Sequence, residues 1–341
     1  MGKAGATMSG QGFLAGLAGS VFVADVDAAE RDPARIAATV VGGLVVGAIA
    51  AFAALILVLV AWTVASGHGS EGVRGIGRAA LSLRDADGRD LGAALLVLTA
   101  PAASNVAFVL GFVGLAALVF RRRFKDYVTA APRVRWRLLL AGLVLSVIAI
   151  TPLMVMDRLI SADATPFPLT VVSPGLAGRA IYVAAAIFLL MPAAAAEEIL
   201  IRGWLLRQFA AFTKRPGVLI VATGIAFSAL HGDFSPGAFL TRALMGAGFA
   251  YMTLRLGGVE CSIGAHAANN ILIVLFVEPL TLKNVAAPSK LTTGSLAEDL
   301  MLIAGYIIIT EAVARIEPLR RWAGVRLDEI AGASQNAVRS G

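Results

Sequence analysis

The sequence predicts an all-α, polytopic integral membrane protein with about eight transmembrane helices. The chain has 341 residues, of which 58% are hydrophobic and only 15% are charged. Soluble domains are roughly 45–50% apolar and about 25% charged. Several uncharged runs reach the ~20 residues that a helix needs to cross a bilayer. These runs lack the alternation of an outer-membrane strand, so the composition excludes both a soluble domain and a membrane barrel.

The first apolar run, residues 36–65, contains no charged residue and exceeds the length of a single span. Seven further runs follow, and the eight expected spans are 36–65, 92–120, 138–156, 180–203, 217–231, 236–254, 258–277 and 299–316. The chain contains 36 glycines, and small residues let helix backbones approach closely in lipid. We therefore expect a closely packed helical bundle.

Basic residues flank the spans and predict the orientation of the chain. The segment 121–137 carries one acidic residue, Asp126, and seven basic ones: Arg121, Arg122, Arg123, Lys125, Arg133, Arg135 and Arg137. Such flanks mark the cytoplasmic side, so with eight spans both termini are expected there, in a plasma or inner membrane. The formal net charge of +7 is then explained by topology and by contact with anionic headgroups. We expect the lipid bilayer, and no nucleic acid, as a partner.

The N-terminal part contains a short apolar run, residues 13–24, that could also be the core of a signal peptide. Its basic region is only Lys3, which favours a mobile or interfacial N-terminal segment instead. The single cysteine, Cys261, lies within an expected span. An internal disulfide is therefore excluded.

The stretch AAAAEEILIRGWL, residues 193–205, places three ionisable side chains in an apolar span. On a helix, Glu198 and Arg202 are spaced i,i+4 and share a face, with the acid in the favourable N-terminal position. Glu197 lies about 100° away from Glu198 around the helix, so it is poorly placed for that pair. We interpret the pair as structural and expect Glu197 to need a partner from elsewhere.

Two of the three histidines also lie in expected spans. His231 follows Phe227 by one turn, and His266 precedes Asn269 and Asn270 by three and four residues. An ionisable residue within a membrane costs ~2.5–3.5 kcal/mol at mid-helix, which makes it a candidate functional residue. Spacing alone leaves the choice between the two asparagines open.

These residues form three ordered motifs: E-E-x-x-x-R (Glu197, Glu198, Arg202), F-x-x-x-H (Phe227, His231) and H-x-x-x-N (His266, Asn270). Together they resemble the CAAX-protease and bacteriocin-processing (CPBP) family of glutamic intramembrane proteases, which includes the type II CAAX prenyl endopeptidases. The resemblance covers residues 180–277. It implies that Glu197 and His231 activate a water, that His266 and Asn270 stabilise the oxyanion, and that Glu198, Arg202 and Phe227 support the site.

The apolar runs, the charged flanks and the resemblance together divide the chain into five expected segments. They are a cytoplasmic N-terminal segment at 1–35, N-terminal membrane helices at 36–156, a protease core like that of the CPBP family at 180–277, a last membrane helix at 298–316 and a cytoplasmic tail at 317–341. The expected activity is hydrolysis of a peptide bond in a membrane-associated peptide or protein, of the CAAX type or in bacteriocin processing.

Three alternatives stay open. The resemblance implies no cofactor, but two histidines and a glutamate could hold zinc with a water in the fourth position. A non-proteolytic immunity or scaffold protein of the same family is the alternative function. A proton-coupled transporter is a third hypothesis, disfavoured because no repeated halves are evident.

The depths of the expected catalytic residues pose a problem. In straight spans, Glu197 lies near the cytoplasmic end of 180–203, whereas His231 lies near the opposite end of 217–231. We expect the helix of Glu197 to continue to about residue 212, because the sequence there remains amphipathic. A short, tilted helix before His231, or a kink at Pro192, would also bring the two together.

Overall fold

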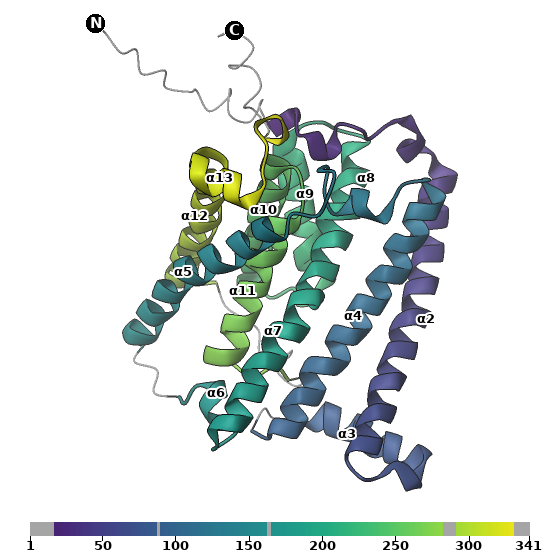
Figure 1. Cartoon of the computed structure of the whole chain (residues 1–341), viewed down its shortest axis with the longest axis vertical. Helices are drawn as coiled ribbons and strands as arrows, with labels where there is room; N and C mark the ends of the chain where they lie inside the picture. The colour runs from purple at the N-terminus through teal and green to yellow at the C-terminus, as the bar shows by residue number, and fades with distance from the viewer. Residues whose placement is uncertain (1–16, 87–88, 162–164, 282–290, 331–341) are drawn as a thin grey trace, which may run out of the picture.

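The computed structural model describes residues 17–86, 89–161, 165–281 and 291–330 (Figure 1). Within these ranges all regular secondary structure is helical, apart from an isolated bridge between Thr129 and Gly258. The predicted class, an all-α polytopic membrane protein, is confirmed.

A helix occurs at each of the eight expected spans. These helices are α2 (Pro33–Ala65), α4 (Leu91–Val119), α5 (Trp136–Ser161), α7 (Leu176–Glu198), α9 (Pro216–Leu230), α10 (Pro236–Leu256), α11 (Glu260–Phe276) and α12 (Thr293–Arg315). Shorter helices connect them, among them α3 (Val73–Asp85), α6 (Pro168–Val171) and α13 (Glu317–Ala323). By length and composition, four helical stretches of the described chain can cross a membrane: Pro33–Ala65, Leu91–Val119, Trp136–Ile160 and Leu176–Ala210.

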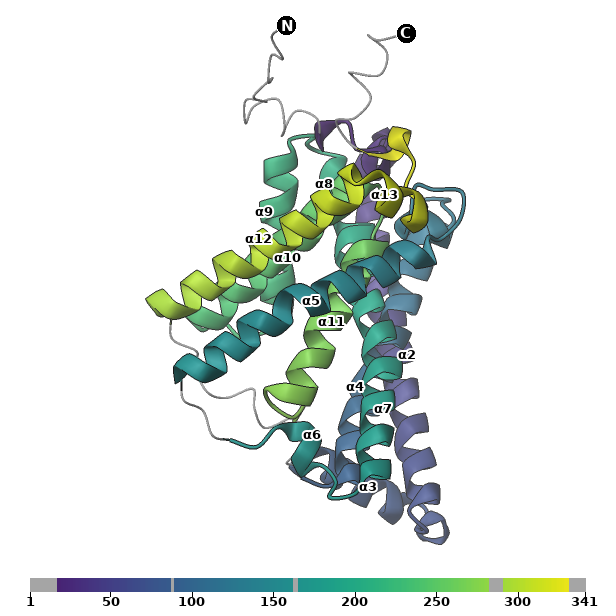
Figure 2. The ribbon, with the colours of Figure 1, turned by 60° about the vertical axis from the view of Figure 1, so that its left-hand side comes forward.

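Helix α2 lies at one edge of the bundle and packs on α4 (Figure 1). Its outward face is apolar: Ile49 and Phe52 are each 65% exposed. Large apolar side chains on an outer helix are favourable in lipid and costly in water. At the other edge, α5 and α12 run obliquely side by side (Figure 2).

The helix that carries Glu197 is longer than the apolar run, as expected. Helix α7 passes directly into a π-helical segment, η5 (Ile199–Leu205), and then into α8 (Leu206–Ala210). We call the whole stretch Leu176–Ala210 the Glu helix. Pro192 lies inside it without ending it.

The depth problem is resolved by the lengths of two helices. Glu197 lies 13 residues before Ala210, the end of the Glu helix, and His231 follows α9, which has only 15 residues from Pro216. At about 1.5 Å per residue, these separations are about 20 Å and about 22 Å. Residues 211–215 join the two helix ends, so Glu197 and His231 reach similar depths. The longer Glu helix and the short helix before His231 both contribute.

Several segments are tied together at the end of the bundle where α4 ends and α5 begins. Arg207 of α8 donates to Asp25 (2.8 Å), and Ser20 donates to the carbonyl of Leu254 (2.6 Å). Arg135 donates to Glu260 of α11 (2.8 Å) and to Glu329 (3.0 Å). The first and last described segments therefore lie at the same end as the basic loop. Its assignment to the cytoplasm stays a prediction.

Glycines allow the central helices to approach closely. A Cβ on Gly264 of α11 would overlap the carbonyl of Leu139 on α5, and one on Gly142 of α5 would overlap the carbonyl of Cys261. These overlaps involve backbone atoms, which cannot move aside as a flexible side chain can. The α5–α11 contact therefore requires glycine on both helices.

We expect Gly264→Ala to lower the free energy of unfolding by about 1–3 kcal/mol, because overpacking forces the backbones apart. Gly114→Ala on α4 is the control, since a Cβ there would meet nothing within 4 Å. That substitution should be neutral or slightly stabilising in a helix. Unfolding of both purified variants by dodecyl sulfate in mixed micelles measures the difference. Equal stability of the two would contradict the packing described.

Candidate active site

A cavity of about 270 Å³ lies between α4, the Glu helix and α9. We call it the site cavity. Its lining consists of Asn105 and Phe108 from α4, Glu197, Leu200 and Ile201 from the Glu helix, and Phe227, Leu230 and His231 from α9 and its end. It combines a carboxylate, an imidazole and an amide with apolar walls. Such a combination is typical of a ligand or substrate site.

Glu197 projects into this cavity and retains 28% of its side-chain exposure. Its Oε1 accepts a hydrogen bond from the side-chain amide of Asn105 at 3.0 Å. Its Oε2 lies 3.7 Å from Nε2 of His266 on α11. The partners of this carboxylate therefore come from other helices, as its position on the Glu helix predicts.

Glu198 and Arg202 form the expected i,i+4 pair, with no exposed side-chain surface on either residue. The guanidinium donates to Oε1 of Glu198 at 2.8 Å and to the carbonyl of Gly246 on α10 at 2.9 Å. A Cβ on Gly246 would lie 2.9 Å from the guanidinium. The pair is thus neutralised locally, and glycine leaves the room for it.

Two aromatic rings enclose Arg202 and His266. The guanidinium lies over the ring of Phe227 at 4.4 Å and over that of Phe249 at 5.3 Å. The same rings contact His266, with centroid separations of 5.5 Å and 5.2 Å. Cation–π attraction strengthens when water is excluded. Phe227 therefore links the ion pair to the histidines, since its ring also lies 4.7 Å from that of His231.

His266 bridges the two glutamates. It is 2% exposed, and its Nδ1 lies 3.0 Å from Oε1 of Glu198. A carboxylate paired with an arginine accepts hydrogen bonds only, so Nδ1 carries the proton in this contact. Nε2 then faces Glu197, and it can donate there only when both ring nitrogens are protonated.

His231 is held by its own helix. Its Nδ1 lies 2.8 Å from the carbonyl of Phe227, and a carbonyl only accepts, so Nδ1 carries the proton. In the neutral ring Nε2 is consequently a lone-pair acceptor. Glu197 and His231 share the site cavity, where a water could lie between them.

Asn270 lies one turn beyond His266 on α11, and its carbonyl oxygen accepts from the side chain of Asn269 at 3.4 Å. The lining of the site cavity described above does not include Asn270. The roles that the resemblance assigns to the three motifs, Asn270 among them, stay predictions.

Two residues at the site have no counterpart in the predicted set. Asn105 was detectable as an amide in the apolar run 92–120, but the resemblance does not reach this span. Phe249 has no signal in the sequence, since a phenylalanine in an apolar helix is ordinary. Both contacts depend on helix packing between segments far apart in the chain.

The zinc alternative requires three converging ligands. Among the residues that the structure describes, no group of three or more His, Cys, Asp or Glu side chains is placed to hold a metal ion. Glu197 lies 3.7 Å from Nε2 of His266, and Glu197 and His231 both line the site cavity.

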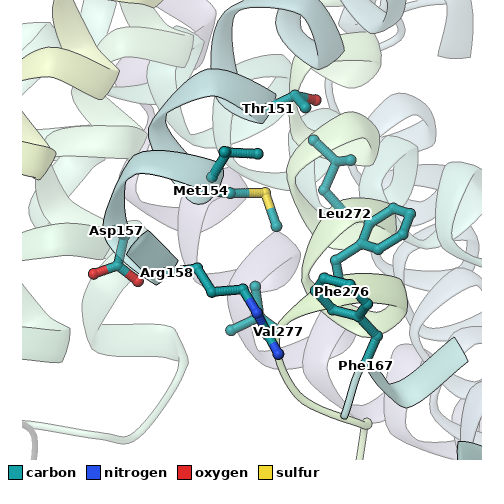
Figure 3. A pocket seen from close by; sticks show the side chains of 9 residues that line it. Thr151, Met154, Asp157, Arg158, Phe167, Leu272, Phe276 and Val277 are labelled. Carbon is teal, nitrogen blue, oxygen red and sulfur yellow. The ribbon is translucent and has the colours of Figure 1, made fainter. Parts of the chain in front are cut away.

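A second cavity, of about 320 Å³, lies between α5, α11 and the segment before α6 (Figure 3). It is walled largely by apolar side chains such as Met154, Leu272 and Phe276, and the guanidinium of Arg158 lies 4.1 Å over the ring of Phe167. None of the predicted site residues lines it.

Comparison with known proteins shows what the site-bearing segment is similar to. Residues 179–272 match the family model described as "Type II CAAX prenyl endopeptidase Rce1-like". The resemblance expected from the three motifs is confirmed over these residues.

A curated relative is the "Uncharacterized protein YyaK" of Bacillus subtilis (strain 168), with 28% identity over 184 residues. The match covers 51% of this chain and 60% of the relative, so the chain spans less than two thirds of that protein's length. No solved structure matches the chain.

We expect Arg202→Met to lower the free energy of unfolding by about 3–5 kcal/mol, because it leaves Glu198 buried without its counter-charge. The double substitution Glu198→Gln/Arg202→Met should recover part of that loss. Arg321→Met is the matched control, since Arg321 pairs with Glu317 at the surface and such pairs contribute little. Unfolding titrations in detergent compare the three. A double variant less stable than Arg202→Met would contradict the account.

Proposed function

We propose that this protein is an intramembrane endopeptidase that hydrolyses a peptide bond in a membrane-associated substrate. The observation that carries the proposal is the convergence of Glu197, His231 and His266 from three helices. Glu197 and His231 line the site cavity, and Nε2 of His266 lies 3.7 Å from Oε2 of Glu197. The family match over residues 179–272 supports the same chemistry.

In the proposed reaction, a water in the site cavity is the nucleophile. Glu197 and Nε2 of His231 orient this water, and one of them takes its proton as the oxygen attacks the scissile carbonyl carbon. The carbonyl π electrons move to oxygen and give a tetrahedral oxyanion. When the intermediate collapses, the same proton passes to the leaving amine nitrogen, and the C–N bond breaks. Water is consumed, and a carboxylic acid and an amine are produced.

The oxyanion requires donors where the negative charge develops, each worth roughly 3–4 kcal/mol in acyl-transfer sites. We assign this role to His266 and Asn270. A doubly protonated His266 would be held by Glu198 through Nδ1 and would present Nε2–H toward the reacting centre. Glu198 and Arg202 then act indirectly, by fixing the orientation and tautomer of His266.

The substrate class follows from the surroundings of the site. Phe108, Leu200 and Leu230 give the site cavity apolar walls, and Glu197 lies about 20 Å along the helix from its end at Ala210. A peptide that reaches this depth must itself tolerate an apolar environment. We therefore propose a lipid-anchored or hydrophobic peptide, of the CAAX or bacteriocin type, as substrate.

Purified protein in detergent or liposomes should cleave a suitable farnesylated or hydrophobic peptide. Glu197→Ala and His231→Ala should each reduce kcat/KM by at least about 100-fold, because each removes part of the acid–base machinery. Glu317→Gln and His68→Ala are matched controls, since both residues lie outside the site and are exposed. Mass spectrometry of the products measures the rate and locates the cleaved bond.

If Glu197→Ala and His231→Ala cleaved as fast as the wild type, the proposed mechanism would be wrong. If the protein cleaved no peptide, and Glu197→Gln retained the cellular phenotype, the non-proteolytic immunity or scaffold function would be favoured instead.

A second test concerns the metal. We expect cleavage to be unaffected by prolonged treatment with 1,10-phenanthroline, because the proposed water is activated by Glu197 and His231 without a Lewis acid. Elemental analysis of the same preparation should show far less than one zinc per chain. Loss of activity on chelation, with recovery on adding zinc, would establish the zinc alternative.

A further inference from the structure

Asn105 is an amide side chain in the middle of a helix of mostly apolar residues. Helix α4 lies outside the segment 179–272 that the family model matches. An amide placed in a membrane helix needs a hydrogen-bond partner, because an unsatisfied polar group in hydrocarbon costs several kcal/mol. In the structure that partner is the carboxylate of Glu197.

The geometry of this contact restricts the carboxylate. Nδ2 of Asn105 donates to Oε1 of Glu197 at 3.0 Å, while Oε2 lies 3.7 Å from Nε2 of His266. One oxygen is therefore held from α4, and the other faces α11. The hydrogen bond to Oε1 restricts rotation of the carboxylate about its last bond and leaves Oε2 on the side of His266.

The helix that carries Asn105 is itself held firmly to the Glu helix. On one side of Asn105, Leu98 packs in a buried cluster with Ala194 of the Glu helix. On the other side, Phe112 makes an edge-to-face contact with Trp204, with ring centroids 4.8 Å apart. The amide therefore lies between two apolar contacts of the same helix pair, and its position relative to Glu197 is fixed.

We propose that Asn105 is a positioning residue that orients the Glu197 carboxylate for its reaction with water. The inference rests on the proposed function, because it assigns Asn105 a role in that reaction. It extends the site to a helix that the family match does not cover. The competing explanation is that the amide merely joins two membrane helices, as amides often do.

The test compares Asn105→Leu, which keeps the size of the side chain, with Asn105→Gln, which keeps an amide donor. We expect Asn105→Leu to lower kcat by about 10- to 100-fold with KM changed less than about twofold, because small misplacements of a reacting group cost up to about 100-fold. Asn105→Gln should retain more of the activity. Thr99→Val is the control on the same helix, since Thr99 bonds to the carbonyl of Leu95 within its own helix.

A spectroscopic readout separates this inference from the proposed function. The infrared band of the Glu197 carboxylate, isolated as the difference between wild type and Glu197→Gln, should move in the Asn105→Leu background and stay in place in Thr99→Val. This measurement does not require a substrate. Unfolding in detergent, recorded for the same variants, shows whether the helix pair remains intact.

The outcomes are distinct. A shifted band together with reduced kcat supports the inference. An unmoved band in Asn105→Leu overturns the inference, whatever the activity. An unchanged kcat in Asn105→Leu also overturns it, provided that the wild type cleaves. If Asn105→Leu lost stability and its kcat and KM changed to the same extent, the amide would only join the two helices, and the inference would also be overturned. A shifted band in a protein that cleaves nothing supports the contact with Glu197 and overturns the proposed function alone.

Discussion

The fully buried ion pair between Glu198 and Arg202 is the interaction on which the rest of the site depends. Two charges in a membrane interior are unfavourable singly, and their pairing makes a polar site possible in this solvent. The guanidinium reaches the carbonyl of Gly246 and the rings of Phe227 and Phe249, so it fixes α9 and α10 around the Glu helix. Glu198 in turn holds His266 of α11. One pair thereby orients three neighbouring helices, while Glu197 remains available at the cavity.

Helix length is the second constraint. Because α9 has only 15 residues, it ends near the depth of Glu197, and His231 lines the site cavity while its Nδ1 faces the carbonyl of Phe227. A full-length span would carry that ring past Glu197. The Glu helix, in contrast, is long and continues past the site, so Glu197 lies well away from either of its ends. The common depth of the two residues follows from this difference between neighbouring helices.

The fold was largely predictable because each span is a local property of the sequence. Apolar runs identify all eight helices, and i,i+4 spacing identifies the pair of Glu198 with Arg202. The end of the Glu helix was less predictable, since residues 204–210 are amphipathic and burial there depends on contacts with the N-terminal segment. The partner of Glu197 could not be predicted, because Asn105 is 92 residues away and their contact arises only from packing of α4. Local spacing likewise cannot place Asn270 relative to the cavity.

The π-helical segment η5 has a consequence for comparing this chain with its relatives. A turn closed by i→i+5 bonds holds one residue more than an α turn, so residues after η5 are rotated by about 100° relative to an uninterrupted α-helix. Helical faces assigned before Ile199 therefore cannot be extended unchanged beyond Leu205. A relative without the extra residue would present a different face of its α8 to the N-terminal segment. The counterpart of Glu197 precedes the π-helical turn, so its orientation does not depend on the extra residue. The part of the helix before η5 and the part after it can therefore change independently of each other in relatives.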